Sequence, residues 1–121
     1  MKYLDINTWN RKQHFEHFSK FVDPYFGVVV DVDVTNTYLF SKKTTIPFFA
    51  LYLHACMKAI NSVENLKYRI IDDKIVIHEL IHASATIFRE DKTFGFTFIN
   101  YSEDFTTFYK NFQIEKERVL N

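Results

Sequence analysis

The feature that most restricts the fold of this chain is an apolar stretch from Ile46 to Ser62, with the sequence IPFFALYLHACMKAINS. Proline at its second position suits the first turn of a helix, because Pro has a fixed φ and no N–H to lose. The apolar side chains that follow cover most of the helix surface rather than one stripe. We therefore predict a helix that is buried on several sides. His54 and Lys58 interrupt it, and a membrane span needs about 20 apolar residues, so no membrane partner is expected.

The chain length suits one domain that spans residues 1–121. A domain of about 100 to 150 residues can bury an adequate core, and no Pro-, Gly- or Ser-rich linker divides this one. Fifteen Lys and Arg side chains balance fifteen Asp and Glu, and no basic run is present, so we expect no nucleic-acid partner. Fourteen Phe residues bring the aromatic content to 18%, which is more apolar area than such a domain can hide. This excess predicts an oligomer or a missing remainder.

The single cysteine and the N-terminal sequence indicate a cytoplasmic protein. Cys56 cannot form an internal disulfide and lies on the apolar helix, where we expect a small buried hydrophobic residue rather than a nucleophile. The start of the chain, MKYLDINTW, lacks the apolar core of a signal peptide, so the sequence gives no support for export.

Residue patterns on both sides of the apolar helix predict further helices and strands. Before it we expect a short strand or extended lead-in at Lys2–Ile6, a helix from Asn7 or Thr8 to about Phe21, a strand at Phe26–Thr35, and a helical or irregular piece at Asn36–Lys43. After it we expect strands at Lys67–Ile71 and Lys74–His78 joined by Asp72-Asp73, strands at Ala83–Arg89 and Thr93–Ile99, and a last helix from Ser102 to the chain end. The four later strands predict an antiparallel meander.

One motif in the first predicted helix resembles a known enzyme family. Residues 9–16, WNRKQHFE, resemble the Trp-x-Arg-Lys/Arg-x-His-Phe-Glu motif near the start of chloramphenicol acetyltransferases. Similar spacing is kept by Asp-Val-Asp-Val-Thr at 31–35, Pro47, Asp72-Asp73, Thr86-Ile87-Phe88, Thr93-Phe94, and Tyr101-Ser102 with Asp104-Phe105. The resemblance spans essentially the whole chain but only the first half, or slightly more, of the family's length. It implies an α/β fold with a mixed, largely antiparallel sheet flanked by helices.

The same resemblance implies an O-acetyltransferase that moves acetyl from acetyl-CoA to the hydroxyl of a small acceptor such as chloramphenicol. It also implies a homotrimer with active sites between subunits, and no metal. The family's general base is a histidine in a His-His-x-x-x-Asp-Gly motif, and none of the histidines here (His14, His17, His54, His78 and His82) stands in that context. We therefore expect no catalytic residue in this chain, which would be inactive alone and supply a wall of the acceptor pocket and subunit contacts. The acceptor stays open, because the resemblance does not separate drug-resistance enzymes from relatives with other acceptors.

The resemblance carries individual roles only to positions that match the family. It implies acceptor-pocket lining for five residues: His17, Phe18, Val22, Thr86 and Phe94. It also implies that Arg11 supports catalysis, since the matching arginine pairs with the aspartate of the catalytic motif. Read without the family, Arg11 is a solvated helix residue, and Phe18 and Phe94 are packing residues.

Two alternative functions come from other features of the chain. The first is a non-catalytic module of the same fold, which binds a ligand or joins full-length subunits. The second is a zinc hydrolase, because His78-Glu79-Leu80-Ile81-His82 is a literal H-E-x-x-H, with Glu103 downstream as a third ligand. The flanking residues are β-branched and predict strands and a turn, on which the two histidines do not share a helical face. We expect no metal there.

Overall fold

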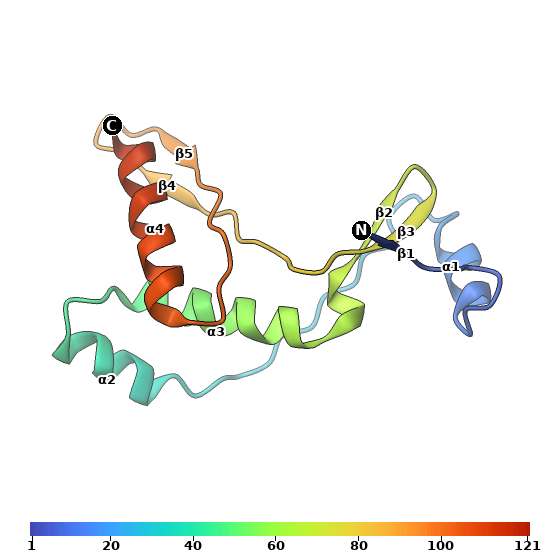
Figure 1. The fold of residues 1–121 in the computed structure, drawn as a ribbon, viewed down its shortest axis with the longest axis horizontal. Coiled ribbons are helices and arrows are strands. Elements are labelled where there is room, and N and C mark those ends of the chain that lie inside the picture. The colour runs from blue at the N-terminus through green and yellow to red at the C-terminus, as the bar shows by residue number, and fades with distance from the viewer.

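The computed structural model describes all residues from Met1 to Asn121. The elements follow in the order β1 (Lys2–Tyr3), α1 (Lys12–Phe18), α2 (Thr35–Lys43), α3 (Phe48–Ser62), the short 3-10 helix η1 (Glu64–Lys67), β2 (Tyr68–Ile71), β3 (Lys74–Ile77), β4 (Thr86–Phe88), β5 (Phe94–Phe96) and α4 (Phe105–Leu120). Figure 1 shows an elongated molecule with α3 near its middle. One end carries α1 with β1, β2 and β3, and the other carries β4, β5 and α4. The predicted α/β class, with antiparallel strands and flanking helices, is confirmed.

The main core forms where α4 crosses α3 (Figure 1). It contains Ala50 and Met57 from α3, Phe108 and Phe112 from α4, and Ala83 and Ile99 from the connections around the β4–β5 hairpin. His54 lies beside this core, and its Nε2 donates a 3.0 Å hydrogen bond to the Ser102 carbonyl oxygen. None of the helices combines the length and the apolar character that a membrane crossing requires.

Helix α4 begins where the sequence places a capping carboxylate. The Asp104 side chain accepts hydrogen bonds from the Thr107 hydroxyl at 2.7 Å and the Thr107 amide at 2.8 Å. These bonds to the charged form lower the pKa of Asp104. Phe108 and Phe112 follow at a spacing of four residues, so both face α3 and are buried. The predicted last helix is therefore confirmed, but it begins at Phe105, after this cap, and not at Ser102.

The predicted hairpin at Asp72-Asp73 is also confirmed. Both aspartates have positive φ, 49° and 60°, as a two-residue turn of the hairpin type requires. Strand β3 lies between β1 and β2 in an antiparallel sheet of order β1-β3-β2, so Ile75, Val76 and Ile77 are buried. The hairpin of β4 and β5 forms a separate sheet, so the single meander expected from the sequence is wrong.

Asn61 at the end of α3 fixes the long connection between β3 and β4. Its side-chain amide donates to the carbonyl oxygens of Met57 and Ile81, each at 2.9 Å. Its side-chain oxygen accepts the Ile81 amide hydrogen at 2.7 Å. One side chain thus satisfies both backbone groups of Ile81, and a backbone bridge between Ala83 and Ile99 then leads into the hairpin.

Several expectations about burial and boundaries are wrong. No strand forms at Phe26–Thr35: residues 26–34 have no regular secondary structure and are exposed, and Thr35 begins α2. A strand needs a partner, and this chain supplies none there. The first helix is shorter than predicted, since the Asp5 side chain binds the Asn7 amide and the Thr8 hydroxyl in a preceding turn. Cys56 is exposed, and α3 buries only Ala50 and Met57, because its neighbours cover one side of the helix.

Candidate functional site

The β4–β5 hairpin presents a row of aromatic side chains on one face. In the antiparallel register Thr86 lies opposite Phe96 and Phe88 opposite Phe94, and opposed residues point to the same side of a sheet. Phe88, Phe94 and Phe96 are 69%, 57% and 66% exposed, and Phe98 continues the row at 58%. The Phe94 and Phe96 rings meet edge to face, with 5.6 Å between centroids. We call Thr86, Phe88, Phe94, Phe96 and Phe98 the aromatic face.

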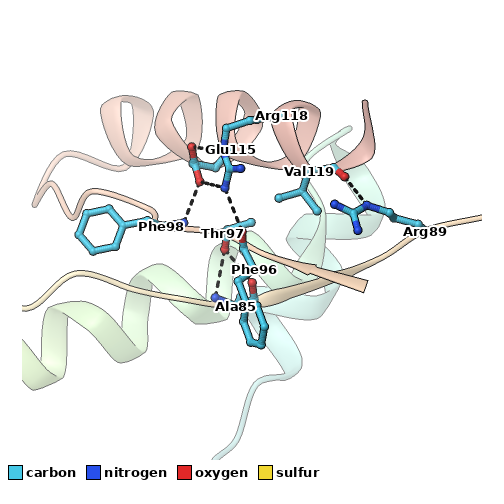
Figure 2. Close-up of polar contacts among 8 residues, drawn as sticks. All are labelled: Ala85, Arg89, Phe96, Thr97, Phe98, Glu115, Arg118 and Val119. Carbon is cyan, nitrogen blue, oxygen red and sulfur yellow. Dashed lines mark hydrogen bonds and ion pairs between the residues drawn. The ribbon is translucent and has the colours of Figure 1, made fainter. Parts of the chain in front are cut away.

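The opposite side of the hairpin packs against α4 through small residues. Gly95 is buried, and a Cβ placed on it would lie 2.7 Å from Val119 Cγ1. The absence of a side chain there lets α4 approach the hairpin closely. Buried Thr97 uses its hydroxyl to accept the Ala85 amide hydrogen at 3.0 Å and to donate to the Ala85 carbonyl oxygen at 2.9 Å (Figure 2). The hairpin is held rigidly from this side, and Phe96 points away from α4.

An ion pair on α4 covers the free edge of β5 (Figure 2). Glu115 accepts the Phe98 amide hydrogen at 2.7 Å, and Arg118 donates to the Phe96 carbonyl oxygen at 2.9 Å. The two side chains also bond to each other at 2.9 and 3.0 Å. Two hydrogen bonds to the charged carboxylate lower the pKa of Glu115 from 4.5 to about 2. The bond from the Arg118 side chain has the larger effect, and the bond from the Phe98 amide has the smaller one. These contacts orient the strand that carries Phe94, Phe96 and Phe98.

We expect Glu115 to stabilise the fold above pH 4.5 and to lose this effect as the pH falls towards 2. Its folded pKa lies below its ordinary value, so the unfolded chain binds the proton first, and acid favours unfolding. Urea unfolding of the parent and of Glu115→Gln, repeated between about pH 5 and pH 3, measures the effect. The difference in unfolding free energy between the two should shrink as the pH falls. Glu117→Gln, at a side chain without an ion pair, is the control, and a difference that is constant with pH would contradict the prediction.

The second group of sequence-predicted residues lies around α1, at the other end of the molecule. Phe18, His17 and Phe21 form a cluster with ring centroids 5.1 to 5.2 Å apart. Val22 is fully exposed just beyond it. Arg11 immediately precedes the helix and is exposed, without an ion pair.

A groove of about 840 Å³ opens beside α1. Arg11 and Phe18 line it, while His17 and Val22 do not. Trp9 forms part of its wall and packs edge to face on Tyr68 of β2, at 6.2 Å between centroids. The groove is therefore built between the α1 region and the three-stranded sheet.

The structure places Thr86 and Phe94 on the same face of the β4–β5 hairpin, where Phe94 lies opposite Phe88, and it brings the His17 and Phe18 rings together. The pair on the hairpin and the pair on α1 do not meet, because α1 and the β4–β5 hairpin lie at opposite ends of the molecule (Figure 1). Sequence reasoning missed Phe88, Phe96 and Phe98 as members of the aromatic face. The alternation in TFGFTFI, residues 93–99, predicts that every second side chain shares a face and is the signal that identifies Phe96 and Phe98.

The H-E-x-x-H segment is not helical. Residues 78–82 follow β3 as an irregular connection, so His78 and His82 do not share a helical face. The His82 Nδ1 accepts the Tyr101 amide hydrogen at 2.9 Å and has a structural role. No group of three or more His, Cys, Asp or Glu residues is arranged to hold a metal ion.

Comparison with known proteins identifies the family. The sequence model described as chloramphenicol acetyltransferase matches residues 1–119. This chain belongs to the chloramphenicol acetyltransferase family. Among similar proteins, a chloramphenicol acetyltransferase of Klebsiella sp is 28% identical over 106 residues, which cover 87% of this chain and 48% of that protein. One of Bacillus pumilus is 25% identical over 111 residues, which cover 91% of this chain and 50% of that protein.

The fold agrees with the family assignment. A solved structure of a chloramphenicol acetyltransferase superposes with a TM-score of 0.90 at 28% sequence identity. The superposition covers 98% of this chain and 56% of that chain. This chain therefore spans about half the length of the chloramphenicol acetyltransferases that it matches.

Proposed function

We propose that this chain forms part of a chloramphenicol-type O-acetyltransferase and supplies part of the acceptor pocket. The family match over residues 1–119 supports the reaction class, and the aromatic face carries the proposal about the pocket. Exposed phenylalanines beside the Thr86 hydroxyl suit an acceptor with an aromatic ring and polar groups, because such a ligand buries the rings and keeps a hydrogen-bond partner.

Acetyl transfer needs a general base that this chain does not provide. We assign that role to a histidine in a part of the protein that corresponds to the other half of the relatives. The imidazole takes the proton of the acceptor hydroxyl while the oxygen attacks the thioester carbonyl of acetyl-CoA, and a hydrogen-bond donor stabilises the tetrahedral intermediate. Its collapse releases the coenzyme A thiolate, which takes the proton from the imidazolium. We propose that the reaction takes place in the cytoplasm and needs no metal.

The distance between the pocket residues on α1 and those on the β4–β5 hairpin indicates how many copies of the chain form one acceptor pocket. Helix α1, which carries His17 and Phe18, lies at one end of the molecule, and the β4–β5 hairpin, which carries Thr86 and Phe94, lies at the other (Figure 1). A single acceptor pocket lined by both groups therefore requires residues from two copies. This requirement fits a homotrimer with its sites between subunits, in which Arg11 would support the catalytic motif.

We expect the chain alone to show no acetyl transfer to chloramphenicol. Fusing it to the part of the Klebsiella relative that it does not match should restore transfer, measured as coenzyme A release. In the active fusion, Phe94→Ala should raise KM for chloramphenicol by about 10- to 100-fold, because losing the burial of one aromatic ring costs about 1.5–3 kcal/mol. Phe40→Ala on α2, at 49% exposure, is the matched control and should leave KM unchanged. Turnover by the chain alone, or an unchanged KM for Phe94→Ala, would refute the proposal.

A second candidate function is a non-catalytic module that binds a ligand or joins full-length subunits. It is favoured by His82, whose Nδ1 lone pair accepts the Tyr101 amide hydrogen, which leaves that ring without a free basic nitrogen. Binding of chloramphenicol to the chain alone, with no coenzyme A release after fusion, would support this function over the first.

A further inference from the structure

Arg89, which immediately follows β4, binds the backbone of two other elements with its side chain. Its Nε donates a 2.6 Å hydrogen bond to the Val119 carbonyl oxygen in the last turn of α4 (Figure 2). Its Nη1 donates at 3.3 Å to the Phe94 carbonyl oxygen, and Arg89 forms no ion pair with any Asp or Glu. A guanidinium holds its N–H donors in a fixed planar fork, so one rigid group joins α4 to the start of β5.

The position of this guanidinium depends on the glycine in β5. A Cβ placed on Gly95 would lie 2.7 Å from Arg89 Nη2 and 3.1 Å from Arg89 Cζ. The guanidinium therefore lies against the Gly95 backbone, on the side of the hairpin that packs against α4. A side chain at position 95 would displace it, so Gly95 makes room for Arg89 as well as for Val119.

Arg89 is the residue that connects the backbone of Phe94 to α4 through hydrogen bonds. The Arg89 amide donates to the Thr93 carbonyl oxygen at 2.8 Å, and the alternation of an antiparallel pair then turns the backbone groups of Phe94 away from β4. Glu115 and Arg118 of α4 bind the corresponding backbone of Phe98 and Phe96, and neither makes a hydrogen bond to Phe94.

We propose that Arg89 is a positioning residue for acceptor binding, because it holds the Phe94 backbone in place and so fixes the direction in which the Phe94 ring faces the acceptor. The inference rests on the proposed function, in which the aromatic face binds the acceptor. Arg89 does not reach that face itself, since its guanidinium lies beside Gly95 on the opposite side of the hairpin. It acts through Phe94, whose side chain loses less conformational freedom on binding when its backbone is already fixed.

The test uses the fusion of the full chain to the part of the Klebsiella relative that it does not match. Arg89→Gln removes the charged fork, and we expect KM for chloramphenicol to rise by about two- to tenfold, the effect of having to order one further side chain. The values of kcat and of KM for acetyl-CoA should stay the same. A purely structural role would leave less folded protein, which lowers the apparent kcat at an unchanged KM, and that result would overturn the proposal.

A double substitution shows whether Arg89 acts through Phe94. In the Phe94→Ala background, Arg89→Gln should cause no further rise in KM, because no ring is left to position. An equal fold-increase in both backgrounds would overturn the proposal. Arg69→Gln is the matched control, since the Arg69 guanidinium also binds two backbone carbonyl oxygens, those of Leu66 and Tyr68, and it should leave KM unchanged.

A measurement on the full chain alone separates this proposal from the proposed function. The Phe94 and Phe96 rings meet edge to face, so the NMR shifts of their ring protons report how Phe94 is placed. Arg89→Gln should move these shifts and Arg69→Gln should not. Unchanged shifts in Arg89→Gln would overturn the positioning role alone. An unchanged KM for Phe94→Ala in the fusion would instead refute the acceptor pocket, and with it this role of Arg89.

Discussion

Replacing Phe108 with alanine should lower the free energy of unfolding by about 3–5 kcal/mol, the largest change expected from a single substitution in this chain. The Phe108 ring is completely buried between α3 and α4, where it packs in one cluster with Ala50, Met57 and Ile99. Removing it leaves a cavity at the place where the two helices cross, since α4 is also held by the hairpin and cannot simply move inward.

Urea unfolding followed by far-UV circular dichroism measures this loss, and Phe98→Ala provides the control. Phe98 is 58% exposed, so the same change of residue type there should cost far less. Similar losses for Phe108→Ala and Phe98→Ala would show that the contact between α3 and α4 is not the main core.

Asn61→Ala should cost about 2–3 kcal/mol, because it leaves the backbone groups of Ile81 without their partners. Asn61 accepts the Ile81 amide hydrogen at 2.7 Å and donates to the Ile81 carbonyl oxygen at 2.9 Å. Asn65→Ala in η1 removes the same amide where it makes no hydrogen bond, so that variant should unfold like the parent. Hydrogen exchange should also become faster at Ile81 in Asn61→Ala. Unchanged exchange at Ile81 would contradict the assigned role.

The elements that the sequence predicts well are those specified by local chemistry. The Asp72-Asp73 turn is set by two residues that tolerate positive φ, and the start of α4 is set by one capping carboxylate. Pro47 similarly marks the start of α3. Each signal lies within a few residues of its effect and does not depend on the rest of the fold.

The predictions that failed concern contacts between distant segments. Residues 26–34 have a strand pattern, but a strand is defined by hydrogen bonds to another strand, and the local sequence cannot specify that partner. Cys56 lies on an apolar helix, yet its exposure depends on which sides of α3 are covered. For the same reason, the sequence indicated Phe94 and Phe18 as site residues but did not show that β5 and α1, which carry them, lie at opposite ends of the molecule.

Because Glu115 and Arg118 form hydrogen bonds along β5, the β4–β5 hairpin has one edge that is covered and one edge, at β4, that is open to a further strand. Arg118 binds the outward carbonyl oxygen of Phe96 in β5, and Glu115 binds the amide of Phe98 just beyond it, so a further strand cannot pair at these two groups. The outward groups of β4, at Thr86 and Phe88, make no backbone hydrogen bond to other parts of the chain. A hairpin open along one edge accepts one neighbour and then stops, which prevents copies of this hairpin from stacking into an unlimited ribbon.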